Sequence, residues 1–358
     1  MTKRSGSNTG FIIAVLLFSM MVAGRGSGAA APAAEPDATA SLCRQEACRS
    51  WVPACTWGPV PTGSELLVIR WLGNSNYEVS YKGQVILVDN FYNRGSRAPY
   101  VGFTPDQVKR ADSIFITHGH KDHMSDTAQV ALQTNAPVYG HQTVIDTLLK
   151  QGVPAQQLHA FNGLETFKFD GFTVQMVHIY HNIGGKTLYR DAIKDYTKPT
   201  PAQLAEEAAI DSRGSNSPDI TLKGLFAFLF TFDSGFTFLG AESAAHPQGW
   251  TDQLKTAVKK HNSTFDVVAV PYQVGYAPLT DIQTKTWPFI QLTNPRLIFP
   301  LHHDVFPDFP MSPTEPLAQK IKEELPGSRF YSPLYREPLC FNVRARSGSP
   351  LLPLCADK

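Results

Sequence analysis

The feature that most constrains this chain is a histidine-rich run directly after a short apolar stretch. Residues 113–117 predict a buried strand, and the run that follows reads HGHKDH. Its candidate ligands are His118, His120, Asp122 and His123. Two histidines spaced two apart in an extended segment point the same way, and the residues just beyond can turn toward a second position. Imidazole and carboxylate groups bind Zn²⁺, Mn²⁺ or Fe²⁺, so the run predicts a metal site rather than a solvated polar loop.

Apolar runs separated by turn residues predict a layered α/β fold. Strand pairs come first along the chain and strands then alternate with helices, a pattern that favours neither an all-β nor an all-α domain. The predicted strands are residues 66–72, 77–81, 85–88, 113–117, 167–169, 173–179, 225–232, 236–239, 265–270 and 297–301. The predicted helices are residues 127–134, 143–150, 201–210 and 249–260, and a further helix is predicted after an N-cap at Ser312 with Pro313 at its first position.

Several other stretches give the histidine run a wider context. Residues 71–75 (WLGNS) and 85–89 (VILVD) are similar to an early strand-turn and a strand of the metallo-β-lactamase superfamily. Residues 171–182 (GFTVQMVHIYHN) resemble the strand that ends in the family's third ligand histidine, and residues 239–243 and 299–302 fall on two of its later motifs. The resemblance covers residues 66–304, and the branch it resembles most contains ascorbate-phosphate lactonases and N-acyl-phosphatidylethanolamine phospholipases.

This resemblance implies a four-layer αβ/βα sandwich with two divalent metal ions at one edge of the strands. The implied ligands are His118, His120 and His181 for the first ion and Asp122, His123 and His302 for the second, with Glu242 as the bridge. Asp122 is also implied to be catalytic. Two ions about 3.5–4 Å apart lower the pKa of a bound water, so the implied nucleophile is a metal-bound hydroxide. Zinc is the first expectation for both ions, with manganese or iron as alternatives.

Three positions depart from the family pattern. Glu242 stands where the family has a bridging aspartate, and Ala241 stands where it has a glycine. The longer side chain leaves open whether the second ion is bound differently or is absent. His303 is an alternative to its neighbour His302 as the ligand, and Asn74 replaces a common histidine with no evident consequence.

Residues 182–223 are rich in Gly, Pro, Asp and Ser and separate two predicted strands. We expect an inserted lid, with a disordered surface insertion as the alternative. Lys186 and Arg190 in this insertion are candidate contacts for an anionic substrate, although a solvated charged face explains them equally simply. Tyr272 lies near a strand end, where the walls of a substrate pocket are expected, although it could equally belong to the core. His303 is a further candidate substrate contact.

The N-terminus has the order of a secretory signal peptide. Lys3 and Arg4 precede the apolar residues 11–23, and small residues follow, so cleavage is predicted between residues 24 and 34. The apolar run is too short to span a bilayer, which predicts export to the periplasm or beyond and no stable membrane anchor after cleavage. The expected organisation is a signal peptide (1–30), a leader (31–63), a hydrolase domain (64–335) and a C-terminal segment (336–358).

The cysteines flank the predicted domain instead of lying within it. They are Cys43, Cys48, Cys55, Cys340 and Cys355. Their spacing is neither a CxxC redox motif nor a zinc cluster, and an exported protein meets an oxidising compartment. We therefore expect structural disulfides, of a connectivity that the sequence does not fix, with one cysteine left over.

Charge argues against a nucleic-acid partner. The chain has 32 Lys and Arg against 31 Asp and Glu, whereas phosphate backbones are bound by basic patches.

The sequence predicts an exported metal-dependent hydrolase of a small molecule, most simply an ester or a lactone. A phosphodiesterase of the same fold and a catalytically degraded binding protein are the alternatives, and the oligomeric state is open.

Overall fold

A computed structural model describes residues 61–181, 198–215, 217, 223–243, 250–272, 279–304 and 311–344. The predicted signal peptide, most of the leader, Lys186 and Arg190 lie outside these residues, as do four of the five cysteines. The exception is Cys340. In the part of the chain that the structure describes, no helix is long and apolar enough to cross a membrane.

The first sheet has seven strands in the order β14-β1-β2-β3-β4-β5-β6. They are β1 (Leu66–Trp71), β2 (Tyr77–Tyr81), β3 (Gln84–Val88), β4 (Ser113–Phe115), β5 (Val138–His141), β6 (Leu158–Phe161) and β14 (Pro338–Asn342). The β2–β3 hairpin turns at Lys82 and Gly83, which both have positive φ (48° and 75°), the backbone of a two-residue type I′ turn. From β3 to β6 the strands run parallel.

The second sheet also has seven strands, in the order β13-β12-β11-β10-β9-β8-β7. They are β7 (Thr166–Phe169), β8 (Phe172–Ile179), β9 (Leu225–Phe232), β10 (Thr237–Gly240), β11 (Val267–Pro271), β12 (Leu297–Leu301) and β13 (Arg329–Phe330). The strands from β10 to β13 are parallel, while β7, β8 and β9 are joined to one another and to β10 by antiparallel pairing.

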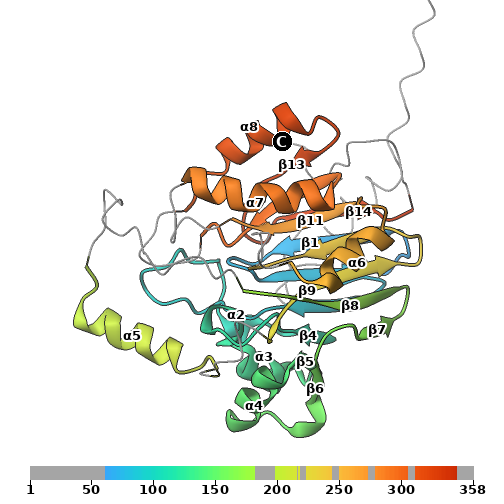
Figure 1. The fold of residues 1–358 in the computed structure, drawn as a ribbon. Helices are drawn as coiled ribbons and strands as arrows, with labels where there is room; N and C mark the ends of the chain where they lie inside the picture. The colour runs from blue at the N-terminus through green and yellow to red at the C-terminus, as the bar shows by residue number, and fades with distance from the viewer. Residues whose placement is uncertain are drawn as a thin grey trace, which may run out of the picture. The chain divides into compact units, whose positions relative to one another are not determined.

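Buried side chains fall into three layers that define a sandwich. The central layer joins the facing sides of the two sheets and is dominated by aromatic residues, such as Phe226, Phe228 and Phe230 of β9. The outer face of the first sheet packs against α3 (Thr127–Thr134) and α4 (Gln142–Lys150), and that of the second against α6 (Asp252–Lys260), α7 (Leu279–Thr293) and α8 (Glu315–Glu324) (Figure 1). The predicted four-layer αβ/βα sandwich is confirmed.

The strand directions bring one set of strand ends together. The strands β1, β3, β4, β8, β10 and β12 all finish next to residues of the predicted metal site or its surroundings. In mixed and parallel α/β sheets, the carboxyl ends of strands carry the functional loops, because helices cover the faces. The fold therefore brings several loops together at this edge, where they could contact one bound ion or molecule. These loops carry the histidine run, His181, Glu242 and His302.

The described part of the predicted insertion contains one helix, α5 (Pro201–Asp211). Thr200 caps it as predicted, since its side chain accepts a hydrogen bond from the Gln203 amide. Another start was predicted wrongly. Helix α8 begins at Glu315 with Thr314 as the N-cap residue, two residues later than the proline pattern indicated. Ser312 is instead buried, and its amide donates to the carbonyl of His303 at 2.5 Å.

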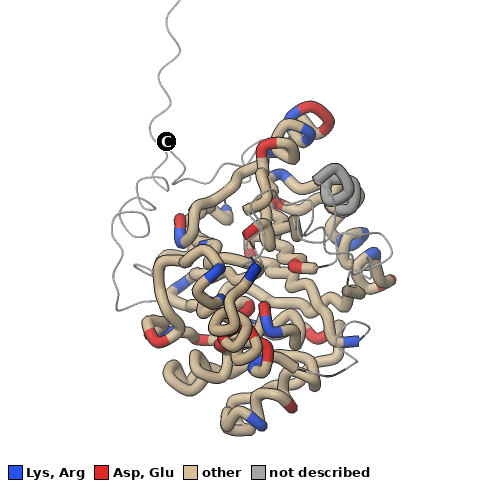
Figure 2. The backbone as a smooth tube through the Cα atoms, turned by 90° about the vertical axis from the view of Figure 1, so that its left-hand side faces the viewer, with Lys and Arg blue, Asp and Glu red and all other residues tan. Residues whose placement is uncertain are grey.

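Some elements were not predicted. Helix α7 contains Pro288, which normally ends or kinks a helix. Strand β14 lies beyond residue 335, where the predicted domain ended, yet it pairs antiparallel with β1 and completes an edge of the first sheet. Over the described residues, the positions of basic and acidic residues are interspersed along the backbone (Figure 2).

Candidate metal centre

The first group of possible ligands is His118, His120 and His181. The first two follow β4, and the third follows β8, so the group joins loops from both sheets. Their ligand atoms all lie within 4.8 Å of one another. The Nε2 atom of His118 is 2.9 Å from Nδ1 of His120, and the ring of His181 packs edge-on against both other rings.

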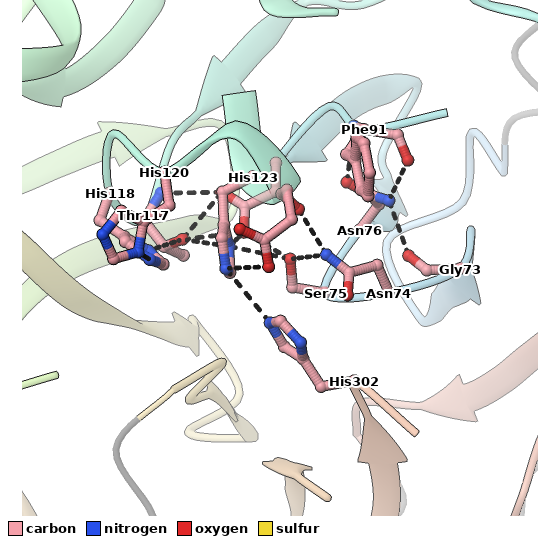
Figure 3. A network of polar contacts seen from close by, with 12 residues as sticks. Gly73, Asn74, Ser75, Asn76, Phe91, Thr117, His118, His120, His123 and His302 are labelled. Atoms are coloured by element: carbon pink, nitrogen blue, oxygen red, sulfur yellow. Dashed lines mark hydrogen bonds and ion pairs between the residues drawn. The ribbon is translucent and has the colours of Figure 1, made fainter. Parts of the chain in front are cut away.

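The second group is Asp122, His123 and His302, again within 4.8 Å of one another. Asp122 and His123 belong to the short helix α2 (Lys121–Met124), and His302 follows β12. The Nε2 atom of His123 is 3.2 Å from Nε2 of His302 and 3.5 Å from Oδ2 of Asp122. Figure 3 shows His302 reaching from the second sheet toward His123.

Both groups have the geometry and chemistry of a divalent-ion site. Four ligands at about 2.0–2.1 Å in a tetrahedron lie about 3.4 Å from one another. The nitrogen pairs at 2.9 and 3.2 Å are close to that spacing without an ion. The groups adjoin, since the rings of His118 and His123 are 3.8 Å apart between centroids. His302, and not His303, completes the second group.

Burial keeps most of these imidazoles neutral. It lowers the pKa of His120 to about 4 and, with the nearby His123, that of His302 to about 3. Burial also lowers the pKa of His118 well below its ordinary value. For Asp122 burial acts upward, but the surrounding histidines outweigh it and lower its pKa to about 2. At neutral pH, His118, His120 and His302 are thus neutral and Asp122 is anionic. For His123, burial acts downward, but the charges of Asp122 and Asp89 outweigh it and raise its pKa.

Asp89 anchors the loop that carries these ligands. Its Oδ2 atom is 2.6 Å from Nδ1 of His123, and its two oxygens accept hydrogen bonds from the amide and hydroxyl of Thr117 at 2.8–2.9 Å. Ser75 adds a bond of 2.9 Å to the same carboxylate. The Asp89 carboxylate holds Nδ1 of His123, so Nε2 is left to face Asp122 and His302. A carboxylate on the other ring nitrogen is a usual partner of a metal-bound histidine. The family motif contained Asp89, but no role for it was predicted.

Glu242 lies in neither ligand group. It is fully buried at the end of β10, and neither carboxylate oxygen has a hydrogen-bond partner of ordinary geometry among the described residues. The Tyr77 hydroxyl lies beside it, and both groups border the space above Gly240. Burial, and then the charge of Asp89, raise the pKa of Glu242 well above its usual value. An orphaned buried carboxylate suits a nearby cation, so Glu242 as the bridge stays a prediction.

Two predicted substrate contacts are described, and both are buried. His303 stacks on Trp71 with 4.4 Å between ring centroids, and burial lowers its pKa to about 4. Tyr272 packs in the apolar layer between the second sheet and its helices. Contact of either side chain with a substrate stays a prediction, as it does for Lys186 and Arg190.

The described part of the insertion lies against the histidine loop. The Ser215 amide donates to the carbonyl of Gly119 at 2.7 Å, Arg213 pairs with the buried carboxylate of Asp126 at 2.7 Å, and Lys121 pairs with Asp211. In the middle of α5, Glu206 binds Ser96 and Glu207 pairs with Arg97. The described part of the insertion is therefore anchored beside His120.

Comparison with known proteins agrees with this geometry. The family model of the beta-lactamase superfamily domain matches residues 85–195, which contain the histidine run and His181. UPF0173 metal-dependent hydrolases of Bacillus cereus and Bacillus anthracis are each 31% identical over 217 residues, which is 57% of this chain and 90% of the relative. The chain belongs to the metallo-β-lactamase superfamily.

A solved structure supports the fold independently of close sequence similarity. A metallo hydrolase from the archaeon Ignicoccus hospitalis matches with a TM-score of 0.53 at 15% identity, over 77% of this chain and 98% of that one. The sequence-based predictions of a metallo-β-lactamase fold and of a metal-dependent hydrolase are confirmed.

Proposed function

We propose that this protein is an exported hydrolase that uses two divalent metal ions to cleave a carboxylic ester or a lactone. The observation that carries the proposal is the convergence of two three-ligand groups at one edge of the sandwich, with the rings of His118 and His123 3.8 Å apart between centroids. Two adjoining groups of this kind suit a hydrolase, because bound divalent ions would supply Lewis-acid chemistry there.

The protein's own residues prepare this site before any ion binds. His118, His120 and His181 would hold the first ion, and Asp122, His123 and His302 the second. Asp89 orients His123 through Nδ1, and burial lowers the pKa of His118, His120 and His302. These three imidazoles would have few protons to release when ions enter. His123 differs, since burial acts downward there too but the charges of Asp122 and Asp89 outweigh it and raise its pKa. Bound divalent ions would supply a nucleophilic water at neutral pH and Lewis-acid stabilisation of the developing negative charge.

The choice of an ester or lactone rests on the resemblance to the lactonase and phospholipase branch, and a phosphodiester is the second candidate. Fold does not fix substrate, so the bond must be tested directly. Turnover of p-nitrophenyl acetate, γ-butyrolactone and bis(p-nitrophenyl) phosphate should be measured on the chelated protein and after addition of zinc, manganese or iron(II). We expect metal-dependent cleavage of the ester or lactone. Faster cleavage of the phosphodiester would favour the second candidate.

A matched pair of histidine variants tests whether the site performs the reaction. His120→Ala removes a ligand of the first group and should abolish turnover. His159→Ala removes an exposed histidine of β6 and should not affect it. Equal activity of the chelated and metal-loaded protein would overturn the mechanism. Bound metal without turnover of any of the three substrates would favour a binding protein on this fold.

Export is the second part of the proposal. Its support is the signal-like N-terminus, and a structural disulfide at Cys340, which is buried in β14, is part of the same proposal. Such bonds persist in oxidising compartments. Non-reducing peptide mapping and N-terminal sequencing of secreted or periplasmic protein are the test. A mature N-terminus between residues 24 and 34 and a disulfide at Cys340 are expected, whereas an intact Met1 with all thiols reduced would contradict export.

A further inference from the structure

Asn74 occupies a strained turn where β1 leaves the first sheet. Gly73 and Asn74 both have positive φ, 89° and 51°, and Asn74 is fully buried. Asparagine tolerates left-handed backbone better than most residues, and the two-residue reversal aims its side chain back into the site. The turn is closely packed, since a Cβ on Gly73 would lie 2.5 Å from a methyl group of Val101.

Asn74 contacts the carriers of the second ligand group on both sides. Its side-chain amide donates to the carbonyl oxygen of Asp122, on the loop from the first sheet. Its own carbonyl oxygen accepts a hydrogen bond of 3.0 Å from the His302 amide, on the loop from the second sheet. Figure 3 shows Asn74 between the α2 segment and the neighbourhood of His302. One residue thus links the two loops that must meet to form the second site.

His302 needs such a link because its backbone is itself strained. Its φ is +61°, which costs free energy for a residue with a side chain and persists only where the surroundings hold it. The bond to the Asn74 carbonyl holds its amide. Two residues further on, Oδ1 of Asp304 accepts a hydrogen bond of 2.9 Å from the backbone amide of Asn74. Its Oδ2 accepts hydrogen bonds from Arg94 at 2.7 Å and from the Tyr335 hydroxyl at 2.5 Å.

We propose that Asn74 is a positioning residue for the second metal ion, because Asn74 fixes the separation between Asp122 and His302. The inference rests on the proposed two-ion function. The donor half of the side chain performs this role, since Oδ1 has no hydrogen-bond partner among the described residues. The nearby Asn76 differs, because among the described residues its side chain binds Gly73 and Phe91 and no ligand residue, so it closes the turn.

Two variants of Asn74 separate its side chain from its backbone. Asn74→Gly keeps the left-handed backbone without strain and removes the side chain with its amide group, while the backbone amide and carbonyl remain. Asn74→Asp keeps the shape but replaces the donor with an oxygen that faces the Asp122 carbonyl. Asn135→Gly is the matched control, because Asn135 has φ +57° at the exposed end of α3, away from both ligand groups. Metal content is measured after limited dialysis, and Co²⁺ titration followed by absorption gives the Kd of each site.

We expect both Asn74 variants to keep one tightly bound ion and to bind the other about 10–100-fold more weakly, the usual effect of losing a residue that orients a ligand. The spectrum of the remaining ion should match that of His302→Ala and not that of His120→Ala. The chelated Asn74→Gly protein should melt close to the chelated wild type. A role limited to folding would lower the melting temperature and leave both affinities unchanged.

Each outcome decides between the proposals. Two ions in the wild type and two in Asn74→Gly, with unchanged Kd values, would overturn the positioning role while leaving the two-ion function intact. A spectrum that matches His120→Ala would also overturn it. One ion in the wild type would overturn the two-ion function and this inference with it. If Asn74→Gly fails to fold, Asn74→Asp answers the same question, because it preserves volume and backbone.

Discussion

Breaking one side of the buried ion pair between Arg94 and Asp304 should cost the folded state several kilocalories per mole. The Arg94 and Asp304 side chains are 1% and 0% exposed, and Nη1 lies 2.7 Å from Oδ2. Arg94→Met keeps much of the side-chain volume and strands the carboxylate. Breaking one side of a buried pair typically costs about 3–5 kcal/mol. Because Asn74 and Tyr335 still donate to Asp304, we expect a value near 3 kcal/mol.

Urea unfolding of the chelated protein measures this cost without a contribution from bound metal. With an m-value of about 3 kcal/mol/M, the midpoint should fall by about 1 M. Arg344→Met is the matched control, since Arg344 pairs with Glu65 at 3.2 Å on the surface, with side chains 60% and 45% exposed. Exposed pairs contribute about 0–1 kcal/mol.

The double variant Arg94→Met/Asp304→Asn adds a second check. Removing the charge as well as its partner should recover part of the loss, because a neutral amide is cheaper to bury than an unpaired carboxylate. The reasoning would be refuted if Arg94→Met cost no more than Arg344→Met, or if the double variant were less stable than the sum of the two single changes.

Three further predictions concern the site and its supports. Gly214→Ala places a Cβ 2.7 Å from the Lys121 amide nitrogen, so it should cost about 1–3 kcal/mol in urea unfolding and weaken the first metal, whereas Gly327→Ala, with open space around it, should do neither. Burial lowers the folded-state pKa of His120 to about 4, so the unfolded chain binds more protons than the folded chain between pH 6.5 and 4. The chelated protein should therefore lose stability as the pH falls through that window, by up to about 1.4 kcal/mol per pH unit for this histidine. The loss should be less steep in His120→Ala. Glu242→Gln keeps shape and removes charge, so it should lower second-metal occupancy and turnover together; two firmly held ions and normal turnover would show that Glu242 is not the bridge.

Sequence patterns were sufficient where local chemistry decides the structure. Strands β9 and β12 have the predicted bounds because their apolar runs end at turn residues. Helix α5 was predicted from the Thr200 cap and Pro201. Helix α7 was missed because Pro288 normally argues against a helix, and the start of α8 was misplaced because Ser312 is held by His303 instead of capping.

All six residues of the two ligand groups were named from the sequence. Four of them lie within one short run, and the resemblance to the family located His181 and His302. The supports could not be predicted, because they depend on contacts between distant segments. Asn74 and Asp304 are 230 positions apart and meet only after the two sheets pack. The consequence of an asparagine at position 74 is therefore visible only in the folded protein.

Each ligand group joins the two sheets, so we expect bound metal to stabilise the fold as well as to support activity. Both groups take two ligands from the loop after β4 and one from the second sheet, His181 or His302. An ion that binds only the folded chain at 100 times its Kd contributes about 2.7 kcal/mol, so two ions contribute about 5 kcal/mol. For a domain of this size each kilocalorie shifts the melting temperature by about 2–4 °C.

Metal removal should therefore lower the melting temperature by about 10–20 °C, measured by differential scanning calorimetry in chelator and in metal buffer. In His302→Ala, metal should raise the melting temperature by roughly half as much as in the wild type, because one of the two ions that join the sheets can still bind. Weak metal binding by the unfolded chain would reduce both shifts but would preserve their ratio. Equal melting temperatures with and without metal would show that these residues do not bind ions across the two sheets, however close their side chains lie.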